Sequence, residues 1–199
     1  MNEKKVVLKV MVTVMIVAMI AAVIPTQAAA YTYNRPSAVN YALKYAYSPN
    51  PDYKYFPNAD CANFVSQCLH AGGWPEQGKY CSGSSSSWYY DWGWRPGYSN
   101  TWAVANNFGR FVSIYSGRGY AYSLAHKPWN QYFKIGDIVQ IDKNRDGRWD
   151  HTMIITRITP SDMYMTYHSE NKRNKSLTQI MSEKREARFI GYRLNDHVN

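Results

Sequence analysis

Residues 58–73 read NADCANFVSQCLHAGG, a stretch that predicts a helix beginning at a cysteine. Asp60 stands where a helix N-cap is expected, since its carboxylate can accept a free backbone N–H. One predicted helical face is apolar and consists of Phe64, Val65, Cys68 and Leu69. Gly72 and Gly73 end the helix, because glycine adopts the left-handed backbone of a helix end. Cys61 therefore lies in the first turn, where the helix dipole favours a thiolate and lowers the pKa of the thiol.

A histidine opens a second informative stretch. Residues 149–155 read WDHTMII and place His151 at the start of an apolar run typical of a strand. A cysteine followed much later by a histidine is the order of cysteine hydrolases whose catalytic residues meet only in the fold. The alternative is that both residues are inert, as we expect for Cys68 in the core.

The block DCANFVSQ, residues 60–67, together with Asp150 and His151, resembles the secreted bacterial putative amidase domain. That family is similar to the NlpC-type and CHAP cell-wall peptidases, which share a papain-like core. The resemblance covers most of the chain after residue 31. It implies an α+β, papain-like fold, in which N-terminal helices, including the cysteine helix, pack on an antiparallel β-sheet. The chemistry of these residues then predicts that Cys61 attacks as a thiolate paired with protonated His151, which gives its proton to the leaving amine.

The resemblance suggests further site residues upstream of the cysteine. In the related peptidases a tyrosine there helps to bind the oxyanion, so Tyr53 and Tyr55 are candidates. The alternative is a tyrosine that packs under the cleft. Asp60 is expected to support the site as a helix cap and to take no direct part in the reaction.

The register of a predicted hairpin adds a third catalytic residue. If strands 151–158 and 163–168 are closed by Ile158 and Met163, Met153 faces His168. Side chains alternate along a strand, so His151 and His168 would then share a face as diagonal neighbours. The NlpC-type enzymes carry a polar residue, often histidine, on the strand after the catalytic histidine, and His168 matches that place. Ser169 and Asn171 are the fallbacks, and a half-solvated histidine is the alternative.

The remaining elements follow from apolar periodicity and turn residues. Helices are expected from the Asn34 cap to Ala46 and over 101–116, and strands over 136–141 and 189–194. Residues 74–100 and 116–129 are expected to be loops. The aromatic loop 74–100 carries Trp88, Trp92 and Trp94, which either bind substrate or pack on the core.

The first thirty residues have the pattern of a signal peptide. A basic start, an apolar run from Val10 to Ile24 and the Ala28–Ala30 motif predict export and cleavage, with an uncleaved anchor as the alternative. Residues 31–199 then form one domain. The segment carries three lysines and one glutamate, so its removal takes the formal net charge from +9 to +7. A basic exported protein suits an anionic cell wall, and no nucleic-acid motif is present.

Two weaker possibilities concern metals and disulfides. Asp142, Asn144 and Asp146 match the first positions of a calcium loop, but residue 12 of that loop is Met153 and not glutamate. We therefore expect a polar turn, and no cofactor. Export permits a Cys68–Cys81 disulfide, which spares Cys61, although a buried Cys68 needs no partner.

The sequence thus predicts a secreted or wall-associated, monomeric thiol hydrolase that cleaves amide bonds in peptidoglycan peptides or at the sugar–peptide link. Endopeptidase, amidase and acyl-transfer reactions use the same residues, so the choice between them stays open. The alternative from another class is a non-catalytic wall- or glycan-binding module that uses the aromatic loop 74–100.

Overall fold

The computed structural model describes residues 30–91, 93, 97–125 and 128–198. The predicted signal peptide, apart from Ala30, lies outside these residues, as do Trp92 and Trp94. Among the described residues, no helix has the length and apolar composition needed to cross a bilayer.

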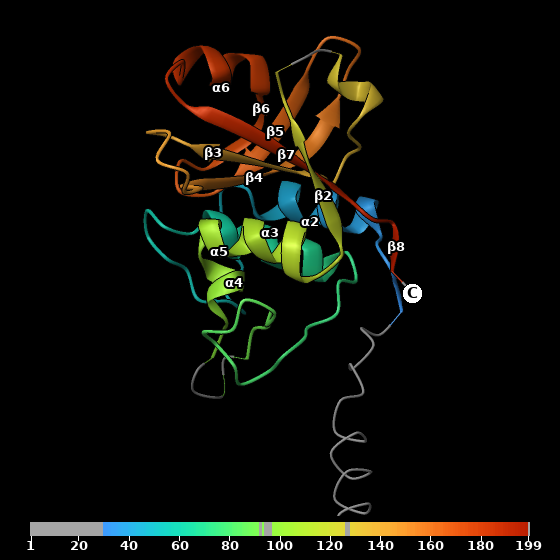
Figure 1. Ribbon diagram of the computed structural model, residues 1–199, viewed down its shortest axis with the longest axis vertical. Helices are drawn as coiled ribbons and strands as arrows, with labels where there is room; N and C mark the ends of the chain where they lie inside the picture. Colours follow the sequence, from blue (N-terminus) through green and yellow to red (C-terminus); the bar gives the residue numbers. More distant parts are fainter. Residues whose placement is uncertain (1–29, 92, 94–96, 126–127, 199) are drawn as a thin grey trace, which may run out of the picture.

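An antiparallel sheet forms the centre of the structure (Figure 1). Its strands lie in the order β2-β7-β3-β4-β5-β6, with the bounds Gly119–Ser123 (β2), Ile138–Asp142 (β3), His151–Ile158 (β4), Met163–Tyr167 (β5), Lys172–Ser176 (β6) and Arg188–Leu194 (β7). A separate two-stranded sheet pairs β1, Tyr31–Thr32, with β8, His197–Val198.

Helices cover both faces of the large sheet (Figure 1). The first face carries α2 (Arg35–Tyr45), α3 (Cys61–Ala71), α4 (Asn100–Ala103) and α5 (Ala105–Arg110), which a π-helix, Phe111–Tyr115, continues. The second face carries α6, Leu177–Glu183, and a short 3-10 helix, Trp129–Gln131, lies before β3. The predicted α+β class is therefore confirmed.

Strand alternation divides the core into two clusters. Ile138 and Ile154 point to the first face, where they join Phe64, Cys68 and Leu69 of α3. Neighbouring residues on the same two strands point to the second face and pack on α6. They are Val139, Ile141, Met153 and Ile155. Because side chains alternate along a strand, each strand supplies both clusters.

Two predicted elements differ from the structure. The expected helix 101–116 is interrupted at Val104, whose φ of −113° and ψ of 120° are extended; a β-branched residue favours that conformation. The expected loop 116–129 contains the edge strand β2, which pairs with β7. β6 and α6 were not among the predicted elements. The helix from the Asn34 cap is confirmed, since the Asn34 side chain accepts a hydrogen bond from the Ser37 N–H.

A β-bulge shifts the register between β4 and β5. Ile158 pairs with Met163 as predicted, but beyond Thr156 the pairing moves by one residue, so that Ile154 lies opposite Thr166. The Thr156 hydroxyl lies 2.8 Å from that of Thr166. The extra residue turns the side chains after Thr166 to the face opposite to the predicted one.

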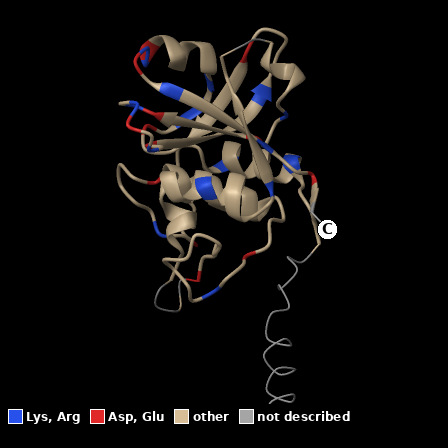
Figure 2. Ribbon diagram, in the orientation of Figure 1, with Lys and Arg blue, Asp and Glu red and all other residues tan. Residues whose placement is uncertain are grey.

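The turn between β3 and β4, residues 143–150, is rich in charged residues (Figure 2). The Asp142 carboxylate accepts hydrogen bonds from the backbone N–H groups of Asp146 and Gly147, both at 3.1 Å, and pairs with Arg188 at 2.8 Å. In the described part of the chain, no cluster of three or more His, Cys, Asp or Glu side chains could hold a metal. The Asp142 side chain thus organises a polar turn.

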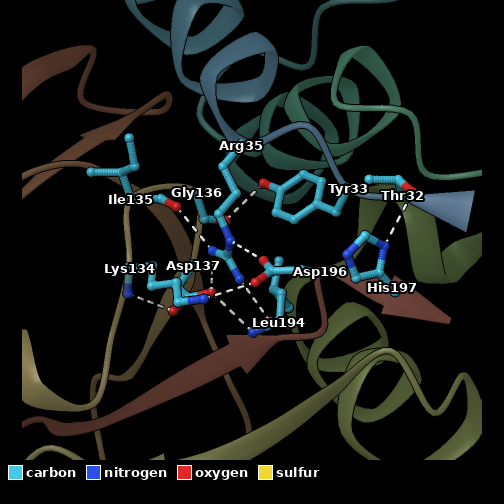
Figure 3. Close-up of polar contacts among 10 residues, drawn as sticks. All are labelled: Thr32, Tyr33, Arg35, Lys134, Ile135, Gly136, Asp137, Leu194, Asp196 and His197. Atoms are coloured by element: carbon cyan, nitrogen blue, oxygen red, sulfur yellow. Dashed lines mark hydrogen bonds and ion pairs between the residues drawn. The ribbon is translucent and has the colours of Figure 1, made fainter.

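Buried Arg35 ties both chain ends to the start of β3 (Figure 3). Its guanidinium lies 2.7 Å from the Asp137 carboxylate and 2.5 Å from that of Asp196, and donates to the carbonyl of Leu194 at 2.7 Å. The Tyr33 hydroxyl donates to the Gly136 carbonyl at 2.8 Å. The two ends of the described chain therefore meet beside Gly136 and Asp137, the residues directly before β3.

Candidate active site

Cys61 and His151 border one cavity of about 350 Å³. Cys61 is the first residue of α3 and His151 is the first residue of β4, so two elements that begin at the same place bring them together. The other lining residues are Asn58, Ala59, Ala103, Val104, Ala105, Lys143, Trp149, Asp150, Ser169 and Glu170. Glu170, Lys143 and Trp149 were not among the residues predicted from the sequence.

The Cys61 side chain is buried against the start of β4. Its Sγ lies 4.0 Å from the carbonyl oxygen of Asp150. Burial raises the pKa of the Cys61 thiol, although backbone N–H groups, including that of Thr152, and the charge of Lys143 oppose the shift. The expectation of a lowered pKa in the free protein is therefore wrong, because desolvation outweighs the helix N-terminus.

His151 is buried and electrically neutral in the free protein. Burial lowers its pKa to about 3, with Lys143 lowering it further and Glu170 raising it. The ring of Tyr167 stands edge-on to the imidazole at 4.8 Å between centroids. Its Nε2 is buried and has no hydrogen-bond partner among the described residues. Most buried polar atoms in proteins are hydrogen-bonded, so this nitrogen is an exception among the described residues.

His168 does not hold the His151 ring. Its Nδ1 lies 2.6 Å from the Asp60 carboxylate and its Nε2 lies 2.8 Å from the carbonyl oxygen of Tyr45. The ring stacks on Phe64 at 3.9 Å. The predicted shared face of His151 and His168 is wrong, because the bulge at Thr156 turns His168 towards α3 and Tyr167 towards His151. Oxygen atoms of Asp60 and Tyr45 thus hold the His168 ring at both of its nitrogens.

Asp60 occupies the N-cap position, but its carboxylate does not cap the helix. It accepts hydrogen bonds from the Phe56 backbone N–H at 3.0 Å and from the Asn63 side-chain amide at 2.8 Å, besides that from His168. The Asn63 side-chain oxygen in turn accepts from the Trp102 indole at 2.8 Å. The predicted cap is therefore wrong in its contacts. Asp60 supports the site by joining α3, the preceding loop and the end of β5.

Neither candidate tyrosine lines the cavity. The Tyr53 hydroxyl lies 3.2 Å from Nδ1 of His70. The Tyr55 ring stands edge-on to His168 at 6.2 Å. Both thus belong to the packing around the cysteine helix, and the structure does not bring either hydroxyl into the cavity beside Cys61.

The two fallback residues after β5 differ. Ser169 lines the cavity and accepts a hydrogen bond from the Asp60 backbone N–H at 3.1 Å. Asn171 has a left-handed backbone with φ of 47° and does not line the cavity. The neighbouring Glu170 does line it. The one-residue shift at the bulge explains why the register argument missed this carboxylate.

Trp88 is a core residue and not a substrate-binding residue. It is fully buried, and its indole N–H donates to the Ser66 hydroxyl at 3.1 Å. Of the two possibilities for Trp88, substrate binding is therefore wrong and packing on the core is confirmed. The three cysteines are all free: Cys68 is buried in the core and Cys81 is exposed, so the possible Cys68–Cys81 disulfide is absent.

Comparison with known proteins gives the family. A family described as "Putative amidase domain" matches residues 32–192. The chain is similar to two proteins of Bacillus subtilis (strain 168): "Uncharacterized protein YjcM", 30% identical over 83% of this chain, and "Uncharacterized protein YhbB", 36% identical over 63% of it. In each case the match covers 38% of the relative's length. No solved structure matches. The chain therefore belongs to the putative amidase domain family over Thr32 to Tyr192, a region that includes Cys61 and His151.

Proposed function

We propose that the protein is a thiol-dependent hydrolase of amide bonds, with Cys61 as nucleophile and His151 as proton carrier. Membership of the family indicates amide hydrolysis in general terms. The observation that carries the finer proposal is the shared cavity: a cysteine at a helix N-terminus and a histidine with an unpartnered Nε2 border the same space. A nucleophile beside a base is the arrangement that covalent catalysis needs.

The reaction starts from a neutral thiol and a neutral imidazole. His151 accepts the thiol proton as Sγ of Cys61 bonds to the amide carbon. The free backbone N–H groups at the start of α3 stabilise the oxyanion. The imidazolium then gives its proton to the leaving amine as the carbon–nitrogen bond breaks. Water, deprotonated by His151, hydrolyses the thioester, which releases the acid and restores the thiol.

Glu170 is suited to stabilise the imidazolium that forms during this reaction. It lines the cavity, and its charge raises the pKa of His151. Although partial burial opposes it, the hydrogen bond from Lys184 lowers the pKa of Glu170, so this carboxylate is ionised at neutral pH. A negative charge beside the base favours its protonated form. Glu170 thus fills the supporting role that the sequence assigned to His168.

The proposed substrate is peptide of the bacterial cell wall, or its link to the sugar, acted on outside the cell. This proposal rests on the formal net charge of +7 after residue 30 and on the signal-peptide pattern. A glycan-binding module needs exposed aromatic side chains. The Trp88 side chain is fully buried and therefore does not support that alternative.

Digestion of purified wall, followed by mass spectrometry of the fragments, tests the function. The wild type should create new amine termini, whose positions identify the bond. Cys61→Ser should create none while binding and fold persist. Cys81→Ser is the matched control, because Cys81 is exposed and does not line the cavity that Cys61 and His151 border. Intact wall with retained wild-type protein would favour the binding module instead.

A further inference from the structure

Lys143 stands between the catalytic cavity and a second cavity. It lines the space that holds Cys61 and His151 and also a neighbouring space of about 240 Å³. The second cavity is otherwise lined by the end of α6 and the residues that follow it: Glu183, Lys184, Arg185, Glu186 and Ala187. Figure 2 shows basic and acidic residues close together in this part of the molecule. A substrate bound across Cys61 can therefore extend past Lys143.

Among the described residues, no carboxylate pairs with the Lys143 ammonium. Its backbone N–H donates to the Asp150 carboxylate at 2.7 Å, which fixes the residue in the turn. No ion pair involves its side chain in the part of the chain that the structure describes. Its charge lowers the pKa of both Cys61 and His151, so the ammonium acts on both catalytic residues. An unpaired charge beside the reacting groups is available to a ligand.

The other charges around the second cavity are mostly occupied. Lys184 pairs with Glu170 at 3.2 Å, and Glu183 pairs with Lys175 at 2.6 Å. The Arg185 Nε donates to the Ser182 carbonyl at 3.3 Å, and no carboxylate pairs with its guanidinium among the described residues. The Glu186 side chain also lines the second cavity, and its negative charge repels an anion there. Lys143 and Arg185 are thus the two cations that can receive an anionic group.

We propose that Lys143, with Arg185, binds a carboxylate of the substrate close to the scissile amide. The substrate class is then an acidic peptide, in which a side-chain or terminal carboxylate lies next to the bond that Cys61 attacks. This inference rests on the proposed function, because it places the carboxylate relative to that reaction. A charged hydrogen bond between ammonium and carboxylate aligns the amide over the nucleophile as well as adding affinity.

The test compares two forms of one substrate pool: wall peptides as purified, and the same peptides with their carboxylates converted to carboxamides. The wild type should lose at least about tenfold in kcat/KM on the amidated peptides, which corresponds to about 1.4 kcal/mol. Lys143→Gln should bring the ratio of the two rates close to one, and Lys143→Arg should keep the preference. Lys79→Gln is the matched control, since Lys79 is exposed and pairs with Glu76 away from both cavity walls.

A binding measurement separates this inference from the proposed reaction. Cys61→Ser, titrated calorimetrically with the two peptide pools, should bind the acidic pool more tightly, and Cys61→Ser with Lys143→Gln should not. Binding preference without turnover by the wild type would overturn the reaction and keep the carboxylate site. Equal binding and equal hydrolysis of both pools, or a preference unchanged in Lys143→Gln, would overturn the carboxylate site alone.

Discussion

The two sides of the cavity that Cys61 and His151 border are built differently. The side that presents Cys61 is a closed network, in which Asp60, Asn63 and His168 satisfy one another's hydrogen bonds beneath the helix. The side that presents His151 ends in a buried Nε2 without a partner among the described residues. The difference is that hydrogen bonds hold the surroundings of the proposed nucleophile, whereas one nitrogen of the proposed base has no protein partner among the described residues.

Replacing His151 is the strongest test of the difference between the two sides of the cavity. His151→Gln removes the proton carrier, so kcat/KM on wall peptides should fall about 100- to 10,000-fold. His70→Gln, which changes an exposed histidine on α3, should leave the rate near that of the wild type. Steady-state kinetics on the two variants measure both effects. Equal rates for wild type and His151→Gln would remove His151 from the mechanism.

Breaking the closed network should act on stability. Asp60→Ala removes the buried carboxylate that holds His168, Asn63 and the Phe56 N–H, so the free energy of unfolding should fall by about 3–5 kcal/mol. Urea denaturation followed by tryptophan fluorescence gives the value. Asp52→Ala is the control, because Asp52 is exposed and belongs to no ion pair among the described residues. A loss below about 1 kcal/mol would show that the network is not what holds Cys61.

The buried neutral His151 also predicts a pH dependence of stability. In the unfolded chain this imidazole takes up a proton below its ordinary pKa of 6.5, whereas in the folded protein burial lowers the pKa to about 3. The unfolded state therefore binds more protons between these values, and stability falls as the pH falls through that window. Between pH 7.5 and pH 5 the wild type should lose about 2 kcal/mol more than His151→Gln. Parallel curves for the two proteins would contradict a buried neutral His151.

The smallest expected effect concerns alkylation. Cys61 is buried and its pKa is raised, whereas Cys81 is exposed. Iodoacetamide at pH 6 should therefore label Cys81 several-fold faster than Cys61, since the thiolate is the reactive form. Peptide mass spectrometry of timed samples measures the two rates. Faster labelling of Cys61 would mean that the thiolate–imidazolium pair already exists before substrate binds.

Local patterns in the sequence predicted the elements that present Cys61 and His151. β4 runs from His151 to Ile158 as expected, and α3 begins at Cys61, because apolar alternation and helical spacing are properties of neighbouring residues. The register beyond Thr156 could not be predicted in this way. It depends on contacts between strands, such as that of Thr156 with Asn174 at 2.7 Å, and those contacts exchange His168 for Tyr167 beside His151.

The partners of a buried aromatic residue were likewise outside the reach of local patterns. The sequence predicted a loop around Trp88 and left open whether its indole packs on the core, where it contacts Trp74 and Trp102 at 5.8 and 4.6 Å. Its Ser66 partner lies on α3, far away in the sequence. A loop can bury its side chains when the fold provides a surface and a hydrogen-bond acceptor, and neither is visible in the loop itself.

The meeting of the two chain ends has a consequence for how the domain can be attached to a larger structure. Tyr31 lies opposite Val198, so any segment joined before β1 or after β8 leaves from one corner of the molecule. β7 runs from Arg188, opposite Asp142 at the cavity end, to Leu194 near that corner, which at about 3.3 Å per residue separates the two places by about 20 Å. A tether at either end, whether a neighbouring domain or a solid support, is thus attached about 20 Å from the end of β7 beside the cavity.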